Sequence, residues 1–592
     1  MFAAVLSIDG APVDASLAQW AAQEGLAIAT VEAGLLTLIA SHDAPVDDEW
    51  RGIACLADRF WLAGRLRLDR RRALRDRLAV AGKASDADLC LQAYAARGES
   101  FVDEIAGDFC FVLWDGSRKE LLGVRDQLGV RSLFHATAGG RHFVSDSLSW
   151  MASRAELDRA LDDYWIADFL SAGHSLDFHR TVFAGIARLP PGHVLKLAGA
   201  DAGTKAYWKL DVPEPLHYRD GRQYAEHFRA LTAEAVADRM PVSGKIGVSM
   251  SGGLDSPTLA AFAVEAAGDR SRIIAECVHY ERLMSDDEAR FSSLAAAHLG
   301  IALRLRAGDD ITFDPDWRRR GLHTAEPTRS IVFAHWTRQI AGEMADIAPV
   351  WLFGEGPDNA LHFERDAYLS WLLQRREWRQ LADAVFPYLW IKGYEAWKRK
   401  TCRRDEAPAV DPDSEVLPAW LDRDLVARLH LEERVRQANE SIDRSHHWHP
   451  RAMGSFANPI WQALFTDRDF DESFASHVWR HPFLDLRVLE FMLAVPPVPW
   501  ARGKLLVRHA MRGRLPREIL ERPKTPLSES PMEAPLRRFG LGALESGHLM
   551  EKYVDTGNVS TSAAAGVDMS ALVAVHALDH WMAHNSGCHE RK

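Results

Sequence analysis

The sequence predicts an α/β protein with two parts, a sheet-rich α+β part followed by a doubly wound parallel sheet. Short apolar runs separated by polar turns dominate residues 1–210, whereas strand-like and helix-like stretches alternate along residues 211–592. The chain has 592 residues, of which 47% are hydrophobic. Because domains usually hold about 100–200 residues, this length allows more than one buried core.

The first part, residues 1–210, combines short strands with two helical stretches, at residues 71–80 and 87–96. The apolar runs that predict strands are residues 3–8, 35–39, 60–62, 109–114, 121–124 and 142–145. This mixture is typical of an α+β domain.

The second part begins near residue 211 and shows the alternation of a parallel sheet. Strands are expected at residues 245–250, 273–280 and 347–353, with helices from Pro257 onward and over residues 286–299. In such sheets ligands bind beyond the carboxyl ends of the strands. The loops that follow the first and third of these strands are therefore expected to face one crevice.

The composition excludes several classes of protein. A formal net charge of −12 argues against nucleic-acid binding. No run of about 18 apolar residues is present to span a membrane. Residues 1–10 lack a basic segment and reach Asp9 too early for a signal peptide. Six scattered cysteines without a C-x-x-C pair are typical of a reducing compartment, so a cytoplasmic location is expected.

The loop Ser251-Gly252-Gly253-Leu254-Asp255-Ser256 joins the first of these strands to a helix and suits an anion. Gly252 and Gly253 allow the backbone to approach a ligand, while the hydroxyls of Ser251 and Ser256 can donate to phosphate oxygens. Pro257 fits the first helical position, where no N–H is needed. The G-x-x-x-x-G-K-[ST] pattern of kinases and GTPases is not present in the sequence.

Two carboxylates predict a magnesium site beside this loop. Asp255 would repel a phosphate unless a divalent cation lies between them, and Asp358, in the loop after the third strand, is expected at the same crevice. Together they form a plausible Mg²⁺ clamp. ATP and Mg²⁺ are therefore the expected cofactors.

This loop is one of eight segments that, taken in their order along the chain, resemble a known protein family. They are GDFCFVLWD, VRDQLGVRSLF, FVSDSLSWM, GIARLPPGH, SGGLDS, GEGPDN, RHPFLDLRVLEF and GKLLVRHAMRGRLPREILERPKT, running from Gly107 to Thr525. The loop resembles the pyrophosphate loop of ATP-pyrophosphatases, and the ordered set resembles the asparagine synthetase family. The resemblance implies a degenerate glutamine amidotransferase-like sandwich domain over residues 1–210. It implies an ATP-pyrophosphatase domain over residues 211–592.

The resemblance also implies roles for single residues. Lys504 would lie against the α-phosphate and stabilise the charge that develops at the acyl centre, and Glu355 would lie near the reacting carbonyl. Lys504 and Arg508 are expected on one helix face at i and i+4. Asn359 stands where the family has a glutamate and cannot supply its charge. The implied nucleotide-binding residues are Ser251, Gly252, Gly253, Asp255, Ser256, Gly354, Arg508 and Lys524.

Glutamine hydrolysis is not expected. Phe2 stands where glutamine-using relatives have a cysteine nucleophile, and Cys55 lies too far along the chain to replace it. Residues 63–65, Ala-Gly-Arg, replace the Asn-Gly-Glu that grips glutamine, and no R-G-P-D motif precedes them. The resemblance therefore implies that the first domain is retained for structure.

A long helical insert, about residues 365–475, enlarges the region between Asp358 and the RHPFLD segment. It is rich in aromatic residues, which we expect to add wall on the acceptor side of the site. His446, His447 and His449 are expected in a surface turn.

The branch that this chain most resembles is the lasso peptide cyclases. These activate an Asp or Glu side chain of a precursor peptide and join it to the peptide's N-terminal amine as a macrolactam. The implied partners are that precursor peptide, a leader peptidase and a leader-binding protein. The alternatives are an ammonia-dependent asparagine synthetase, a β-lactam-forming synthetase and a non-catalytic scaffold that keeps ATP only as a ligand.

Overall fold

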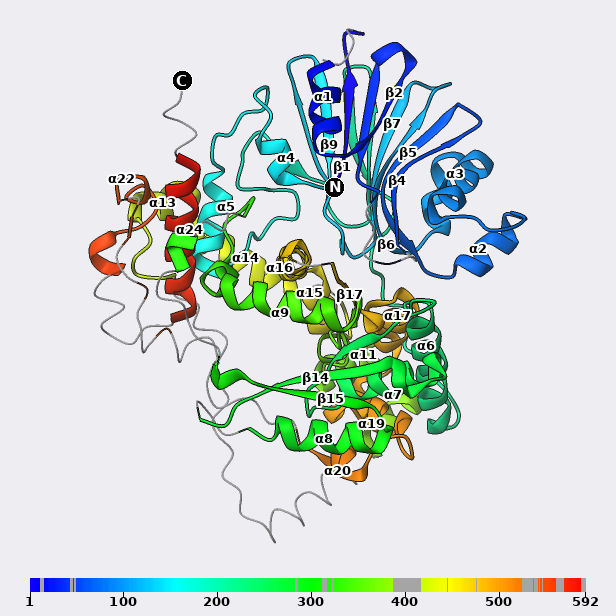
Figure 1. Ribbon diagram of the computed structural model, residues 1–592. Helices are drawn as coiled ribbons and strands as arrows, with labels where there is room; N and C mark the ends of the chain where they lie inside the picture. The colour runs from blue at the N-terminus through cyan, green and yellow to red at the C-terminus, as the bar shows by residue number, and fades with distance from the viewer. Residues whose placement is uncertain are drawn as a thin grey trace.

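The fold is taken from a computed structural model, shown in Figure 1. It describes residues 1–10, 15–42, 46, 49–282, 286–310, 317–320, 324–386, 417–443, 446–474, 476–523, 536, 541, 544, 545, 547–559 and 569–586. Three sheets organise these residues, two antiparallel sheets in the N-terminal part and one parallel sheet in the C-terminal part.

The N-terminal part is a sandwich of two six-stranded sheets with the orders β10-β8-β9-β1-β3-β2 and β12-β11-β7-β6-β5-β4. Its strands are β1 Phe2–Ser7, β2 Ala27–Val31, β3 Leu36–Ala40, β4 Trp50–Leu56, β5 Phe60–Leu68, β6 Gly107–Asp115, β7 Glu120–Arg125, β8 Phe134–Ala138, β9 Arg141–Ser145, β10 Ala187–Arg188, β11 His193–Ala198 and β12 Asp201–Ala206.

Apolar side chains of both sheets meet in one core, since Leu6 and Leu38 of the first sheet cluster with Val112 and Leu195 of the second. Helices cover the outer faces. They are α1 Ala15–Gln23, α2 Arg71–Arg77, α3 Asp86–Arg97, α4 Leu148–Ala152 and α5 Asp163–Ala172. The expected α+β sandwich between helices is confirmed.

The C-terminal part is built on a five-stranded parallel sheet with the order β15-β14-β13-β16-β17. Its strands are β13 Ile246–Ser249, β14 Ile273–His279, β15 Ala302–Ala307, β16 Val350–Leu352 and β17 Val478–Arg480. The three expected strands are present, and β15 and β17 were not predicted. Only glycine fits at position 247, because the indole of Trp351 on the neighbouring strand fills the place of a Cβ.

Helices pack on both faces of this sheet, as a doubly wound fold requires. Val350 and Leu352 point to the core that α6, α7 and α8 share, whereas Trp351 points to the opposite face beside Met344 of α9. The helices near the sheet are α6 Gly221–Ala237, α7 Asp255–Ala267, α8 Glu288–Leu299, α9 Ala334–Ile347, α10 Pro357–Ala360, α17 Leu486–Ala494, α18 Pro497–Trp500, α19 Leu505–Ala510 and α20 Arg517–Glu521.

The first helix after the phosphate loop starts earlier than expected. Because α7 begins at Asp255, Pro257 is its third residue and not its first. A proline is still tolerated there, since the first four N–H groups of a helix have no partner within it. The helix ends at Gly268, whose φ of 67° lies in the left-handed region.

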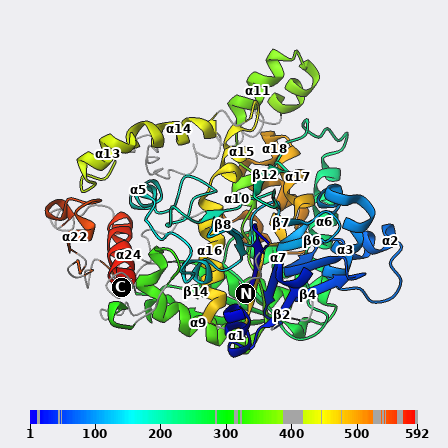
Figure 2. The ribbon, with the colours of Figure 1, turned by 90° about the horizontal axis from the view of Figure 1, so that it is seen from above.

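The insert region adds α11 Arg365–Gln374, α13 Arg423–Leu429, α14 Leu431–Asp443, α15 Pro450–Ala457 and α16 Ile460–Phe474, and the chain ends with α22 Gly547–Met550 and α24 Met569–Ser586. Helix α14 lies beside α5 of the N-terminal part in both views (Figures 1 and 2). There Arg434 donates to Asp168 at 2.7 Å. The insert therefore contacts both parts of the molecule.

A network of buried ion pairs joins the N-terminal part to the C-terminal part. Arg239 of the C-terminal part pairs with Asp69 at 3.0 Å and with Asp485 at 2.7 Å. Arg67 pairs with Asp69 at 2.8 Å and with Asp108 at 2.9 Å. Although burial opposes ionisation, the two arginines hold the pKa of Asp108 well below its usual range. The carboxylates are thus neutralised by arginines.

Candidate active site

A cavity of about 1150 Å³ opens at the carboxyl ends of β13, β14 and β16 and is also lined by Trp479 of β17. Its walls also include α9, α16 and the segment that leads into α19. This is the edge where ligands of parallel α/β sheets bind. The residues predicted for the site that line this cavity are Ser251, Gly253, Asp255, Ser256, Gly354, Glu355, Asp358, Lys504 and Arg508.

The phosphate loop is held in shape by its own hydroxyls. The backbone N–H of Ser251 donates to the Ser256 hydroxyl at 2.8 Å, and the two hydroxyl oxygens lie 2.9 Å apart. The N–H of Gly253 donates to the Ser251 hydroxyl at 3.2 Å. The first turn of α7 follows directly, so its N-terminus is directed at the cavity rim where the loop and Asp255 lie.

Gly252 lies behind the loop, packed against other side chains. Its N–H donates to the carboxylate of Glu288 at 2.6 Å. A Cβ at this position would lie 2.5 Å from Nη1 of Arg522 and 2.8 Å from Cβ of Phe291. The structure thus gives Gly252 a packing role, and its direct contact with phosphate stays a prediction.

Asp255 and Asp358 converge on a single cation, the ammonium group of Lys504. Nζ of Lys504 pairs with Asp255 and lies 2.8 Å from Asp358. Burial works against the charged ammonium, but the two carboxylates outweigh it and raise the pKa of Lys504. A pair of carboxylates that already shares one cation fits Mg²⁺, which binds oxygen ligands and phosphates together.

Lys504 lies outside the helix that was expected to carry it. Its φ of 55° is left-handed, and α19 begins at the next residue. Lys504 and Arg508 are therefore not an i, i+4 pair within one helix, a correction to the expectation. The turn bends the backbone so that the ammonium reaches the two aspartates.

Arg508 lines the cavity but directs its donors at carbonyl groups. It donates to the carbonyl oxygens of Gly503 at 2.5 Å, of Arg522 at 2.9 Å and of Leu520. Arg508 thereby fixes the turn after α20. Its contact with nucleotide stays a prediction, as does that of Lys524, which lies outside the described residues.

Glu355 lies on the cavity wall, near Asp255, Asp358 and Arg468 of α16. Burial raises the pKa of Glu355, and the nearby carboxylates of Asp358 and Asp255 add to this, while Arg468 opposes it. The guanidinium of Arg468 lies 4.3 Å from the ring centre of Phe353 and 4.6 Å from that of Trp479. A carboxylate in this setting is a stronger base than an exposed one.

Aromatic side chains form a large part of the cavity wall. These aromatic residues are Tyr280, Phe333, Trp336, Trp351, Phe353, Phe363 and Trp479. None of them is a predicted site residue, and the short β17, Val-Trp-Arg, carries little strand signal of its own. The wall was expected instead from the aromatic residues of the insert.

That expectation is wrong for the aromatic residues of the insert that pack in the core. Tyr368 stacks on Trp371 with ring centres 6.2 Å apart, and Trp448 packs edge-on against Tyr368 at 5.8 Å. These rings belong to the core around α6 and α17 and do not line the cavity. Tyr388, Trp390, Tyr394 and Trp397 lie outside the described residues.

The predicted surface turn is wrong for His449, which is fully buried. Its Nδ1 lies 3.2 Å from the carbonyl oxygen of Leu493, and its Nε2 lies 3.4 Å from Glu364. Burial lowers the pKa of His449 to about 4, so the ring is neutral near pH 7. It therefore serves packing.

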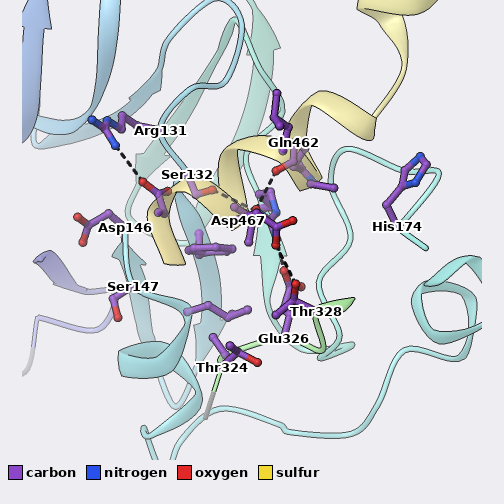
Figure 3. A pocket seen from close by; sticks show the side chains of 18 of the residues that line it. Arg131, Ser132, Asp146, Ser147, His174, Thr324, Glu326, Thr328, Gln462 and Asp467 are labelled. Atoms are coloured by element: carbon purple, nitrogen blue, oxygen red, sulfur yellow. Dashed lines mark hydrogen bonds and ion pairs between the residues drawn. The ribbon is translucent and has the colours of Figure 1, made fainter. Parts of the chain in front are cut away.

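A second cavity, of about 960 Å³, lies between the N-terminal sandwich and α16 (Figure 3). Met1, Arg65 and Cys110 line it from the sandwich. Leu464, Asp467 and His477 line both cavities, so they form a shared wall. Thr328 donates to Asp467 at 2.8 Å, and Arg131 donates to Asp469 at 2.9 Å. The polar groups around this cavity are thus largely engaged with one another.

We expect no release of glutamate from glutamine. The thiol that lines the second cavity, Cys110, is buried, and burial raises its pKa well above the usual range, so it is a poor nucleophile. Phe2 is buried within β1, and Arg65, at the position of the missing clamp, pairs with Glu49. A glutaminase assay tests this, and Phe2→Cys alone should not create activity. Release above that of a Cys110→Ala variant would contradict the expectation.

Fold and cavity together define an α/β protein in which a parallel sheet with a cavity at its Ser-Gly loop lies beside a sandwich of two antiparallel sheets. A model described as "Asparagine synthase" matches residues 227–583, and one described as "Glutamine amidotransferase domain" matches residues 69–208. The chain belongs to the asparagine synthase family. The domain boundary predicted near residue 210 stays a prediction.

Individual relatives are distant. The chain is 27% identical to "Amidase chyE" of Penicillium rubens over 38% of this chain and 35% of that protein. It is 21% identical to "Asparagine synthetase [glutamine-hydrolyzing] 3" of Bacillus subtilis over 77% of this chain and 73% of that protein. The chain thus spans about a third of the length of the first relative.

Among solved structures, a glutamine phosphoribosylpyrophosphate amidotransferase from B. subtilis is 12% identical, covering 60% of this chain and 70% of that one. Its TM-score of 0.22 is too low to infer a shared fold. Among the helices that the structure describes, none has the length and apolar character needed to cross a membrane.

Proposed function

We propose that this protein is an ATP-dependent ligase that forms an amide from a carboxylate and an amine. The single observation that carries the proposal is the convergence of Asp255, Asp358 and Lys504 at the phosphate loop. A cation-bearing site at a helix N-terminus suits a nucleotide triphosphate. Glu355 faces the same cavity.

The reaction has two steps. A carboxylate oxygen of the substrate attacks the α-phosphorus of ATP, the bond to the bridging oxygen breaks, and pyrophosphate leaves. The amine then attacks the acyl carbon of the acyl-adenylate, and AMP leaves with the former carboxylate oxygen. The amine loses one proton, which we assign to Glu355 because its carboxylate is made more basic by burial.

Lys504 acts on the developing negative charge. Its ammonium is placed by two carboxylates and lies on the cavity wall, so little rearrangement is needed when charge develops at the α-phosphate and at the acyl oxygen. Mg²⁺, held by Asp255 and Asp358, would supply charge neutralisation for the departing pyrophosphate.

We further propose that the acid is an Asp or Glu side chain of a precursor peptide and the amine is that peptide's own N-terminus, as in lasso peptide cyclases. The cavity volume of about 1150 Å³ exceeds the range of about 300–1,000 Å³ usual for small-molecule sites. Its aromatic wall suits a peptide better than ammonia. The partners would be the precursor peptide, a leader peptidase and a leader-binding protein, in the cytoplasm.

A small-molecule ligase is the second candidate, either an ammonia-dependent asparagine synthetase or a β-lactam-forming synthetase. It is favoured by the relative named as an asparagine synthetase, which matches 77% of this chain. The two candidates share the activation step and differ only in the acid and the amine, so substrate dependence separates them.

The experiment incubates the protein with ATP, Mg²⁺ and a leaderless core peptide that has a free N-terminus. We expect AMP and a peptide lighter by one water, both seen by mass spectrometry. A control peptide with an acetylated N-terminus should not cyclise. AMP formation that responds to aspartate and ammonia, and to no peptide, would contradict the peptide substrate and support the small-molecule ligase.

A further inference from the structure

An arginine and a glutamate form a second polar layer behind the phosphate loop. The carboxylate of Glu288, the first residue of α8, accepts the N–H of Gly252 at 2.6 Å through one oxygen. Its other oxygen accepts from Nη2 of Arg522 at 3.0 Å. Glu288 therefore links the loop to Arg522. Glu288 and Arg522 both line the catalytic cavity.

One nitrogen of this arginine has no acceptor. Nη1 of Arg522 is buried and makes no hydrogen bond within the described part of the chain. The side chain is only 10% exposed, and the guanidinium lies 4.4 Å from the ring centre of Phe291. A buried charged N–H group without an acceptor is unfavourable, so such groups usually meet a ligand or water.

The backbone beneath Arg522 is also held in place. Arg508 donates to the carbonyl oxygens of Arg522, at 2.9 Å, and of Leu520. Gly252 leaves open the space that Nη1 of Arg522 and the Phe291 side chain occupy. Contacts of its backbone and of its side chain thus hold Arg522 in place, next to the loop that is expected to hold phosphate.

The wall of the cavity carries both carboxylates and cations. The carboxylates of Asp255, Asp358, Glu288 and Glu355 all lie on its wall. Lys504 already serves the two aspartates, and Arg508 donates to carbonyl oxygens. Arg468 lies near Glu355, and Mg²⁺ held by the two aspartates would add positive charge. The guanidinium of Arg522, beside the phosphate loop, would add to this charge where the triphosphate binds.

We propose that the guanidinium of Arg522 contacts the phosphate groups of the bound nucleotide, and that Glu288 is a positioning residue that holds both Arg522 and the loop. The proposal rests on the proposed function only in that the cavity binds ATP. It does not depend on which acid or amine the protein uses.

The test compares the binding of ATP and of adenosine, with Mg²⁺ present, by calorimetry on the full chain. Arg522→Gln should weaken ATP binding by about ten- to a hundredfold, the effect of one lost charge-assisted hydrogen bond, and should leave adenosine binding unchanged. Arg522→Lys should restore part of the affinity. Glu288→Gln should weaken ATP binding less, because its amide oxygen can still accept from Gly252 but carries no charge.

Arg514→Gln is the matched control, since Arg514 pairs with Glu265 at 2.7 Å on an exposed part of the same domain. It should bind both ligands as the wild type does. Unchanged ATP affinity in Arg522→Gln, or an equal loss for ATP and adenosine, would overturn the proposal. Wild-type protein that binds ATP but forms no amide would contradict the proposed function alone.

Discussion

Asp255→Asn and Asp358→Asn should each abolish pyrophosphate release while the protein stays folded. Each change removes one of the two carboxylates that converge on Lys504. Losing one metal ligand removes several kcal/mol of charge stabilisation in the transition state, which lowers the rate by about a thousandfold or more. A coupled pyrophosphate assay measures the rate, and the thermal melting temperature reports the fold.

Asp366→Asn is the control for this pair. Asp366 is an exposed acid that pairs with its neighbour Arg365 on α11, away from the cavity, so its loss should leave the rate unchanged. If either Asp255→Asn or Asp358→Asn kept most of the wild-type rate, the two-carboxylate clamp would be wrong.

Methionine in place of Lys504 should leave ATP binding close to that of the wild type and should nearly eliminate the amide product. The phosphate loop hydrogen bonds do not involve Lys504. An uncharged chain of similar length cannot stabilise negative charge at the acyl centre, and the loss of one such donor lowers the rate by about a hundred- to a thousandfold. Calorimetry reads binding, and mass spectrometry reads product.

Lys552→Met serves as the matched control, because Lys552 forms an exposed pair with Asp163 at 2.7 Å. It should form product at the wild-type rate. Product formation by Lys504→Met within a few-fold of the wild type would remove Lys504 from the chemistry. Loss of ATP binding together with product would instead make Lys504 a ligand-binding residue only.

Much of the site follows from local sequence. The run from β13 through the Ser-Gly loop to α7 is contiguous, so strand, turn and helix signals lie side by side. Asp255 and Asp358 were expected together because parallel strands bring their following loops to one edge. The contact of both with Lys504 agrees with that reasoning.

Other parts could not be predicted because they depend on segments far apart in the chain. Nothing near His449 indicates that Glu364 and the carbonyl of Leu493 will enclose it. The glycine before Lys504 resembles a helix start, yet the backbone at Lys504 is left-handed. The ammonium of Lys504 meets Asp255 and Asp358, which lie far away in the chain. The role proposed for Arg522 depends on its hydrogen bond to Glu288, which lies on a helix far away in the chain.

The aromatic residues of the insert show a further limit. Their number indicates that a large apolar surface is buried, but it does not indicate which surface. Tyr368, Trp371 and Trp448 fill the core beside α6, while the cavity takes its aromatic wall from Phe333, Trp336 and other residues outside that cluster.

The central claim is that a substrate carboxylate is activated by transfer of AMP, and an oxygen label tests it most directly. A core peptide whose acceptor side-chain carboxylate carries a heavy oxygen isotope is cyclised with ATP and Mg²⁺. Because AMP leaves with a carboxylate oxygen, the account predicts heavy oxygen in AMP and none in pyrophosphate. Unlabelled AMP, or ADP with labelled inorganic phosphate, would contradict activation at the α-phosphate.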